Sequence, residues 1–186
     1  MAHRVCPWWL GYLLASPVRR LMQDPRKLLA PYIREGMTVL EPGPGMGFFT
    51  VELARLVGAS GRVVAVDIQP RMLSSLKRRA ARAGMARRVE TRLAAPESLN
   101  IPELSGAVDF TLAFALVHEL PAVEAFFAQI AAASKPGAGL LFAEPAGHVK
   151  PPVFDAELAS AVAAGFNVVD RPTIRSSHAA FLKKAQ

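Results

Sequence analysis

Cysteine is almost absent from this chain, because Cys6 is the single one among 186 residues. An internal disulfide is therefore excluded, and a reducing compartment, the cytoplasm, is predicted. Long apolar runs are absent as well. The apolar segment at residues 5–15 is shorter than the roughly 20 residues that cross a bilayer, and it lacks the cleavage site of a signal peptide. We expect this segment to form a helical lid over the domain rather than a contact with lipid.

Acidic residues are fewer than basic ones. The chain has 15 Asp and Glu against 22 Lys and Arg, which gives a formal net charge of +7 and favours anionic partners such as RNA, acidic metabolites or membrane head groups. Many of the basic residues lie within residues 77–92, but no aromatic residues interleave with them to stack on bases. Met72, Leu76, Ala80 and Ala83 form an apolar stripe opposite the charges. We therefore favour a solvated outer helix over a nucleic-acid footprint.

Repeats and low-complexity linkers are also missing, so we expect one domain over residues 1–186, with a helical lid at 1–35 and a cofactor-binding core at 36–186. Short β-rich runs alternate with helical periods, which predicts a parallel sheet covered on both faces. The expected strands are residues 38–41, 62–67, 89–93, 108–114 and 139–144, and the expected helices are 25–33, 48–57, 70–83, 121–134 and 151–164.

Two further extended runs, residues 166–174 and 177–183, end the chain. They are too close together for a crossover helix, so they must pair antiparallel. The predicted fold is α/β: a Rossmann-like, seven-stranded, mostly parallel sheet with a C-terminal antiparallel hairpin and N-terminal helices.

A glycine-rich turn follows the first predicted strand, in residues 41–47 (EPGPGMG). Glycine lets the backbone turn sharply and lets a ligand lie against it without a Cβ clash. The helix that follows presents N–H groups to a negative or polar group. Asp67 ends the second predicted strand, where a carboxylate can accept hydrogen bonds from both ribose hydroxyls or, alternatively, cap the next helix. Together the two features predict an adenosine-containing ligand at the carboxyl edge of the sheet.

Two classes of adenosine ligand fit this pattern. A nicotinamide or flavin dinucleotide usually binds to G-x-G-x-x-G. Here the third glycine, Gly47, comes one place early, and Phe48 occupies the required position. S-adenosylmethionine, in contrast, has no phosphate and carries a sulfonium that must point towards a methyl acceptor. The nicotinamide-dependent oxidoreductase is therefore disfavoured.

These motifs resemble those of the class I S-adenosylmethionine-dependent methyltransferases, and the histidine at position 118 resembles the small-molecule branch of that family, which often has His there. Residues 41–47 resemble the first motif of the family, residues 64–67 resemble the ribose-binding strand, and residues 135–141 resemble the lead-in to the fifth strand. The terminal hairpin is a further mark of that family, and the resemblance extends over about residues 37–184. It implies an enzyme that takes a methyl group from S-adenosylmethionine and releases S-adenosylhomocysteine.

The resemblance also assigns cofactor-binding residues by position. It places Glu41 near the methionine amino end, Asp67 on the ribose and Ile68 against the adenine. The family often has an Asp after the third strand that binds the adenine amino group, but this chain has none there, and Pro96 has no N–H to donate. Adenine is expected to be recognised differently, through the Ala94 or Ala95 backbone or Glu97. The expected cofactor-binding set is Glu41, Gly43, Gly45, Gly47, Asp67, Ile68, Ala94, Ala95 and Phe114.

His118 and Glu119 follow the fourth predicted strand, where an acceptor would meet the sulfonium. His118 suits a general base for a hydroxyl or a carbon acid, with Glu119 orienting it. The alternative is that both residues cap a helix or bind the backbone. An N/D-P-P-Y motif, which methyltransferases acting on amino groups of bases or amides often carry here, is missing. We therefore favour a small-molecule acceptor over RNA or protein, and keep a cofactor-binding module without turnover as a further alternative.

Glu144 and His148 follow the fifth predicted strand on the same edge of the sheet. We expect them to line the substrate pocket together with Trp8, Tyr12 and Met22 from the N-terminal helices. Two acids and two histidines raise the question of a metal site. No H-E-x-x-H motif is present, so no metal is expected.

Overall fold

The structure, a computed structural model, describes residues 24–186. Predictions made for Cys6, for the apolar segment at residues 5–15, and for Trp8, Tyr12 and Met22 lie outside the described residues. Within residues 24–186, none of the helices has the length and apolar character needed to cross a membrane.

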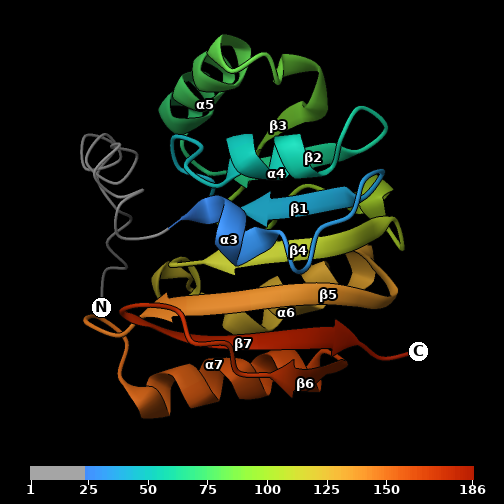
Figure 1. The fold of residues 1–186 in the computed structure, drawn as a ribbon. Coiled ribbons are helices and arrows are strands. Elements are labelled where there is room, and N and C mark those ends of the chain that lie inside the picture. Colours follow the sequence, from blue (N-terminus) through green and yellow to red (C-terminus); the bar gives the residue numbers. More distant parts are fainter. Residues whose placement is uncertain (1–23) are drawn as a thin grey trace.

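A seven-stranded sheet forms the centre of the protein (Figure 1). Its strands, in chain order, are β1 (Thr38–Pro42), β2 (Arg62–Asp67), β3 (Val89–Leu93), β4 (Val108–Phe114), β5 (Ser134–Pro145), β6 (Phe166–Asp170) and β7 (Ser177–Lys184). The order across the sheet is β3-β2-β1-β4-β5-β7-β6. β1 to β5 are parallel, and β7 runs antiparallel to both β5 and β6. The predicted fold is confirmed, and the structure adds that β7 lies between β5 and β6.

The helices cover both faces of this sheet (Figure 1). They are α3 (Pro25–Leu29), α4 (Thr50–Leu56), α5 (Pro70–Arg82), α6 (Val123–Ala133) and α7 (Pro151–Ala163), with short 3-10 turns η1 (Ala86–Arg88), η2 (Pro102–Leu104) and η3 (Val117–Glu119). The Asp24 carboxylate caps α3 by accepting the Arg26 backbone N–H at 2.9 Å. The helix expected to reach residue 33 ends at Leu29, because Pro31 has no N–H to continue the ladder.

Strand β5 begins at Ser134, earlier than the expected residue 139. Val108 of β4 pairs with Ser134, but the next paired residue, Phe110, is opposite Gly139. The intervening residues form an irregularity of the kind seen at β-bulges, and Gly137 there has a φ of +75°. Residues 135–137, which were expected to lie between the helix and the strand, therefore already belong to β5.

Alternation along the strands builds a hydrophobic core on each face of the sheet. Val39 and Leu141 pack on the face covered by α3 and α4, whereas their neighbours Leu40 and Phe142 pack on the face covered by α6 and α7. All four side chains are fully buried. Because both faces are filled, polar ligands can be bound only at the ends of the strands.

Candidate functional site

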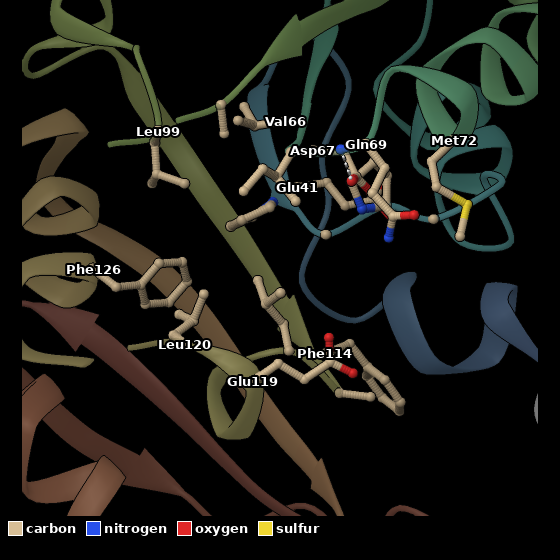
Figure 2. A pocket seen from close by; sticks show the side chains of 18 of the residues that line it. Glu41, Val66, Asp67, Gln69, Met72, Leu99, Phe114, Glu119, Leu120 and Phe126 are labelled. Atoms are coloured by element: carbon tan, nitrogen blue, oxygen red, sulfur yellow. Dashed lines mark hydrogen bonds between the residues drawn. The ribbon is translucent and has the colours of Figure 1, made fainter. Parts of the chain in front are cut away.

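A cavity of about 490 Å³ opens at the carboxyl ends of β1, β2 and β4 (Figure 2). β1 pairs with β2 as far as Pro42, but its last pair with β4 is Leu40 with Thr111. β1 and β4 therefore separate at the carboxyl end of β1. This gap is the topological switch point of the sheet. From β1 the chain continues to β2 and β3 on one side of the sheet, whereas β4 and β5 lie on the other side of β1.

The glycine turn forms one wall of the cavity. Gly43 has a φ of +65°, and a Cβ atom there would lie 2.9 Å from Leu116 Cδ1. Gly47 has a φ of +83°, and its Cβ would lie 2.3 Å from Leu76 Cδ1 of α5. The first glycine therefore keeps the turn close to the segment after β4, and the second lets it pack against α5. The helix expected from Phe48 begins at Thr50, so residues 45–49 form turns in front of it.

Two buried carboxylates stand at the inner end of the cavity. Glu41 at the end of β1 is 3% exposed, and its Oε2 atom has no hydrogen-bond partner in the described structure. Burial raises the pKa of Glu41 to about 7; the neighbouring Thr50 hydroxyl opposes this shift, and the nearby Asp67 charge adds to it. Burial likewise raises the pKa of Asp67 to about 6, against the Gln69 and Gly45 backbone N–H groups, which lower it. One oxygen of Asp67 accepts the Gln69 N–H at 2.8 Å, so the alternative of a local turn-capping role is present as well.

The cavity as a whole is acidic, although the chain is basic. Its lining contains the carboxylates Glu41, Asp67, Glu97 and Glu119, and among the described lining residues there is no Lys, Arg or His. Carboxylates in a partly dry cavity stabilise a cation and repel an anion. The site therefore fits S-adenosylmethionine, which carries a sulfonium and an ammonium, and it offers no cation to a dinucleotide pyrophosphate.

The segment after β3 also lines the cavity, and the backbone N–H groups of Ala94 and Ala95 are already used within the protein. The Ala94 N–H donates to the Asp67 carbonyl at 3.0 Å, and the Ala95 N–H donates to the Ser98 carbonyl at 2.8 Å. Gln129 of α6 holds the same segment by accepting the Leu99 N–H at 2.8 Å. The N–H groups of Ala94 and Ala95, which were expected to bind adenine, thus already donate hydrogen bonds within the protein.

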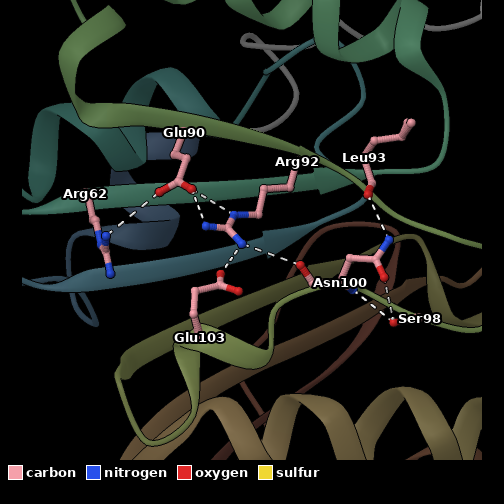
Figure 3. Close-up of polar contacts among 7 residues, drawn as sticks. All are labelled: Arg62, Glu90, Arg92, Leu93, Ser98, Asn100 and Glu103. Atoms are coloured by element: carbon pink, nitrogen blue, oxygen red, sulfur yellow. Dashed lines mark hydrogen bonds and ion pairs between the residues drawn. The ribbon is translucent and has the colours of Figure 1, made fainter.

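Arg92, the last residue of the basic stretch 77–92, is held in place by polar contacts close to this segment (Figure 3). Arg92 of β3 forms ion pairs with Glu90 and with Glu103 of η2, and Arg62 lies 3.9 Å from Glu90. Asn100, with a φ of +52°, donates from its side chain to the Leu93 carbonyl at 3.2 Å. Arg92 is therefore occupied by acids of the protein itself, and does not contribute to an anion-binding face.

The segment after β4 separates the expected catalytic pair. Glu119 lines the cavity, whereas His118 stands behind it with Nε2 3.9 Å from Glu119 Oε1. Glu144 is fully buried and binds His118 Nδ1 through Oε2, and the His148 ring lies 6.3 Å from the His118 ring, centre to centre. His118, Glu144 and His148 thus lie together beside the cavity, and none of the three is among its lining residues.

Most of the expected cofactor-binding residues line the cavity together. These are Glu41, Gly43, Gly45, Asp67, Ile68, Ala94, Ala95 and Phe114. Gly47 is not among the lining residues, since it faces α5. Sequence reasoning missed Leu99, Phe126 and Gln129, which line the cavity from the β3–β4 segment and α6. The helical period of α6 indicated a buried face, but no sequence signal showed that this face borders a ligand site. Within residues 24–186, no three His, Cys, Asp or Glu residues are placed to hold a metal ion.

The sheet order, the terminal hairpin and the acidic cavity at the switch point are those of an α/β protein suited to a cationic nucleoside. Residues 39–137 match the family model described as a methyltransferase domain, which is more than half of the chain. The protein belongs to this methyltransferase family. Its fold and family model are those of the class I S-adenosylmethionine-dependent methyltransferases.

Curated relatives are methyltransferases of several kinds. A ubiquinone biosynthesis O-methyltransferase from Methylocella silvestris is 32% identical over 143 residues, which are 76% of this chain and 53% of the relative. A ribosomal protein L11 methyltransferase from Pelotomaculum thermopropionicum is 33% identical over 115 residues, 62% of this chain and 34% of the relative. The chain thus spans about half or less of these relatives.

Solved structures share the fold over nearly the whole chain. A SAM-dependent methyltransferase from Aquifex aeolicus has a TM-score of 0.85 at 24% identity, covering 96% of this chain and 99% of that one. At this identity the likeness shows the fold alone. The acceptor has to be inferred from the site.

Proposed function

We propose that this enzyme transfers the methyl group of S-adenosylmethionine to a small molecule that is neutral or cationic where it enters the cavity. The observation that carries this proposal is the cavity lining, which has four carboxylates and, among the described residues, no cationic side chain. A phosphorylated or carboxylated acceptor would have to approach these acids without a counter-charge. The acceptor group is a hydroxyl or a carbon acid, in line with the absence of the N/D-P-P-Y motif. The O-methyltransferase relative supports a hydroxyl.

In this proposal the cofactor lies along the inner wall of the cavity. The unpartnered Glu41 oxygen faces the cationic end of the methionine half, Asp67 accepts hydrogen bonds from the ribose, and Ile68 packs on the adenine. Gly43 and Gly45 let the backbone approach the ligand. Ala94, Ala95 and Phe114 complete the walls, and Gly47 supports the turn from behind. The bound S-adenosylmethionine supplies an activated methyl group, while the protein aligns the acceptor with it.

The N-terminal residues 1–35 are proposed to belong to the same single domain and to cover the acceptor, with Trp8, Tyr12 and Met22 contributing to its pocket. A cytoplasmic location stays a prediction from the composition.

Transfer to RNA or protein is the second candidate, and the basic helix α5 favours it. Arg78 and Arg82 are exposed on this helix, while Met72 and Leu76 are buried beneath them. This is also the pattern of an ordinary solvated helix. The two candidates differ in salt dependence: RNA binding that weakens steeply with salt, and that is lost in Arg78→Glu/Arg82→Glu, would support the second one.

The decisive experiment supplies methyl-labelled S-adenosylmethionine to the protein with separated metabolite, lipid and RNA fractions. Label in a neutral or cationic small molecule is the expected result, whereas label in RNA alone would overturn the proposal. Calorimetric titration with S-adenosylhomocysteine and with NADH forms the control. Binding of S-adenosylhomocysteine without label in any fraction would favour a cofactor-binding module.

A further inference from the structure

Glu144 lies at the end of β5, in the middle of the sheet, and its side chain is 0% exposed. Its Oε1 atom accepts the backbone N–H groups of Leu116 at 3.1 Å and Val117 at 2.6 Å. Its Oε2 atom binds His118 Nδ1. A buried carboxylate with three hydrogen-bond partners is held in one position. Glu144 therefore fixes both the backbone of η3 and the ring that η3 carries.

The backbone in front of η3 is shaped to reach this carboxylate. Ala115 has a φ of +55°, a left-handed conformation that is unfavourable for a non-glycine residue. The turn at Ala115 brings two successive N–H groups onto one oxygen of Glu144, and it places Glu119 at the cavity wall. The strain at Ala115 is offset by these hydrogen bonds, which are buried and charge-assisted.

His118 is surrounded by acids from three elements. Glu144 on β5 binds its Nδ1, Glu119 lies 3.9 Å from its Nε2, and Glu157 of α7 contributes a further negative charge. The pKa of His118 is raised, first by the hydrogen bond to Glu144 and then by these charges, while burial opposes the shift. His148 is the other titratable ring nearby, edge-on at 6.3 Å between ring centres. When the His118 ring is protonated, it donates from Nδ1 to Glu144 and directs its Nε2–H towards Glu119.

Resting on the function proposed above, we propose that Glu119 takes the proton of the methyl acceptor, and that His118 is a positioning residue clamped at Nδ1 by Glu144. Glu119 lines the cavity, whereas His118 and Glu144 do not. The Nε2–H of His118 faces the Glu119 carboxylate and keeps it turned towards the acceptor. This arrangement reverses the roles expected from the sequence, in which His118 is the base and Glu119 orients it.

The proton and electron balance of the step is simple. The acceptor atom forms a bond to the methyl carbon while the sulfur–carbon bond breaks, and that electron pair stays on sulfur as a neutral thioether. The proton of the acceptor passes to the Glu119 carboxylate, which returns it to water when the products leave. No oxidant, metal or further co-reactant is needed. A carboxylate suits an acceptor whose proton becomes acidic as its bond to carbon forms.

The protonation of His118 can be measured by imidazole nitrogen NMR on the protein saturated with S-adenosylhomocysteine. We expect protons on both ring nitrogens at about pH 7, and a fall of the His118 pKa by at least about one unit in Glu144→Gln. Glu157→Gln is the matched control, because it removes a neighbouring carboxylate while leaving the Glu144 clamp, and the shift should be smaller. A His118 ring without a proton on Nε2 at neutral pH in the unmodified protein would overturn the inference, whether or not Glu144→Gln folds.

The catalytic role of Glu119 can be tested by measuring methyl transfer from labelled S-adenosylmethionine to catechol, which serves as a hydroxyl probe. Glu119→Gln should lower kcat by at least about 100-fold with little change in KM for the cofactor, while His118→Asn, which retains a donor towards Glu144, should lower it by about tenfold or less. Equal losses in both variants would refute the assignment. If S-adenosylhomocysteine binds but catechol is not methylated, the result counts against a hydroxyl acceptor. The NMR spectrum of His118 would then still test the proposed role of His118.

Discussion

Replacement of Glu41 by Gln should make the unliganded protein more resistant to alkaline conditions while weakening its hold on the cofactor. Glu41 is 3% exposed and has a pKa of about 7 in the folded protein, against an ordinary value of 4.5. Because the folded pKa lies above the unfolded one, the unfolded state binds fewer protons between these values. Stability contributed by protonated Glu41 is therefore full below about pH 4.5 and is lost as the pH rises through about 7.

The size of the effect follows from the shift. A difference of about 2.5 units between the two states corresponds to roughly 3 kcal/mol, of which about 2.5 kcal/mol falls between about pH 5 and about pH 8.5. Wild-type protein should lose that much more unfolding free energy over this interval than Glu41→Gln does. Comparing slopes with pH removes the fixed cost of burying an amide, since that cost is the same at both ends of the interval.

The change in unfolding free energy between the two pH values can be measured for both unliganded proteins by urea unfolding, with fluorescence or circular dichroism as the signal. Glu97→Gln, which changes an exposed carboxylate on the same cavity, is the matched control for the loss of one negative charge. It should leave the wild-type pH dependence in place. If Glu41→Gln showed the same slope as wild type, then Glu41 would not be held protonated by burial, and the electrostatic account of the cavity would be wrong.

Three further outcomes are expected. Asp67→Ala should weaken S-adenosylhomocysteine binding by roughly 1.5–3 kcal/mol in calorimetry, and an unchanged affinity would contradict the ribose assignment. S-adenosylmethionine affinity should fall by about tenfold from about pH 8 to about pH 6, because protonation of Glu41 and Asp67 competes with a cation; a flat profile would argue against it. Gly47→Ala should lower the thermal midpoint more than Gly45→Ala, since both have positive φ but only the Cβ at 47 would meet Leu76, at 2.3 Å; equal losses would remove that explanation.

Local patterns in the sequence were sufficient to predict the architecture. The alternating apolar residues of β1 and β5 fill cores on opposite faces, and the short spacing between the last two strands leaves antiparallel pairing as the only connection. The glycines at 43 and 47 have positive φ values in the structure, in line with the sharp turn that was expected there. These features depend on residues close together in the chain, where period, propensity and turn chemistry are decisive.

The order of strands at the C-terminal edge was not predictable in this way. Residues 166–183 indicate a hairpin, but its insertion with β7 beside β5 depends on which strand fills the open edge. The start of β5 was missed for a related reason. Lys135 and Gly137 are typical of a loop, yet pairing between Val108 and Ser134 extends the strand across them.

The sequence by itself determined the fold, and it predicted the cofactor and the binding edge, because each rests on a local motif whose backbone has few alternatives. Only the tertiary structure decided the chemistry of the site. The acidic lining of a basic protein and the burial of Glu144 beneath His118 join residues that lie tens of positions apart. Charge and protonation depend on distance and on exclusion of water, and these quantities exist only once the strands have been brought together.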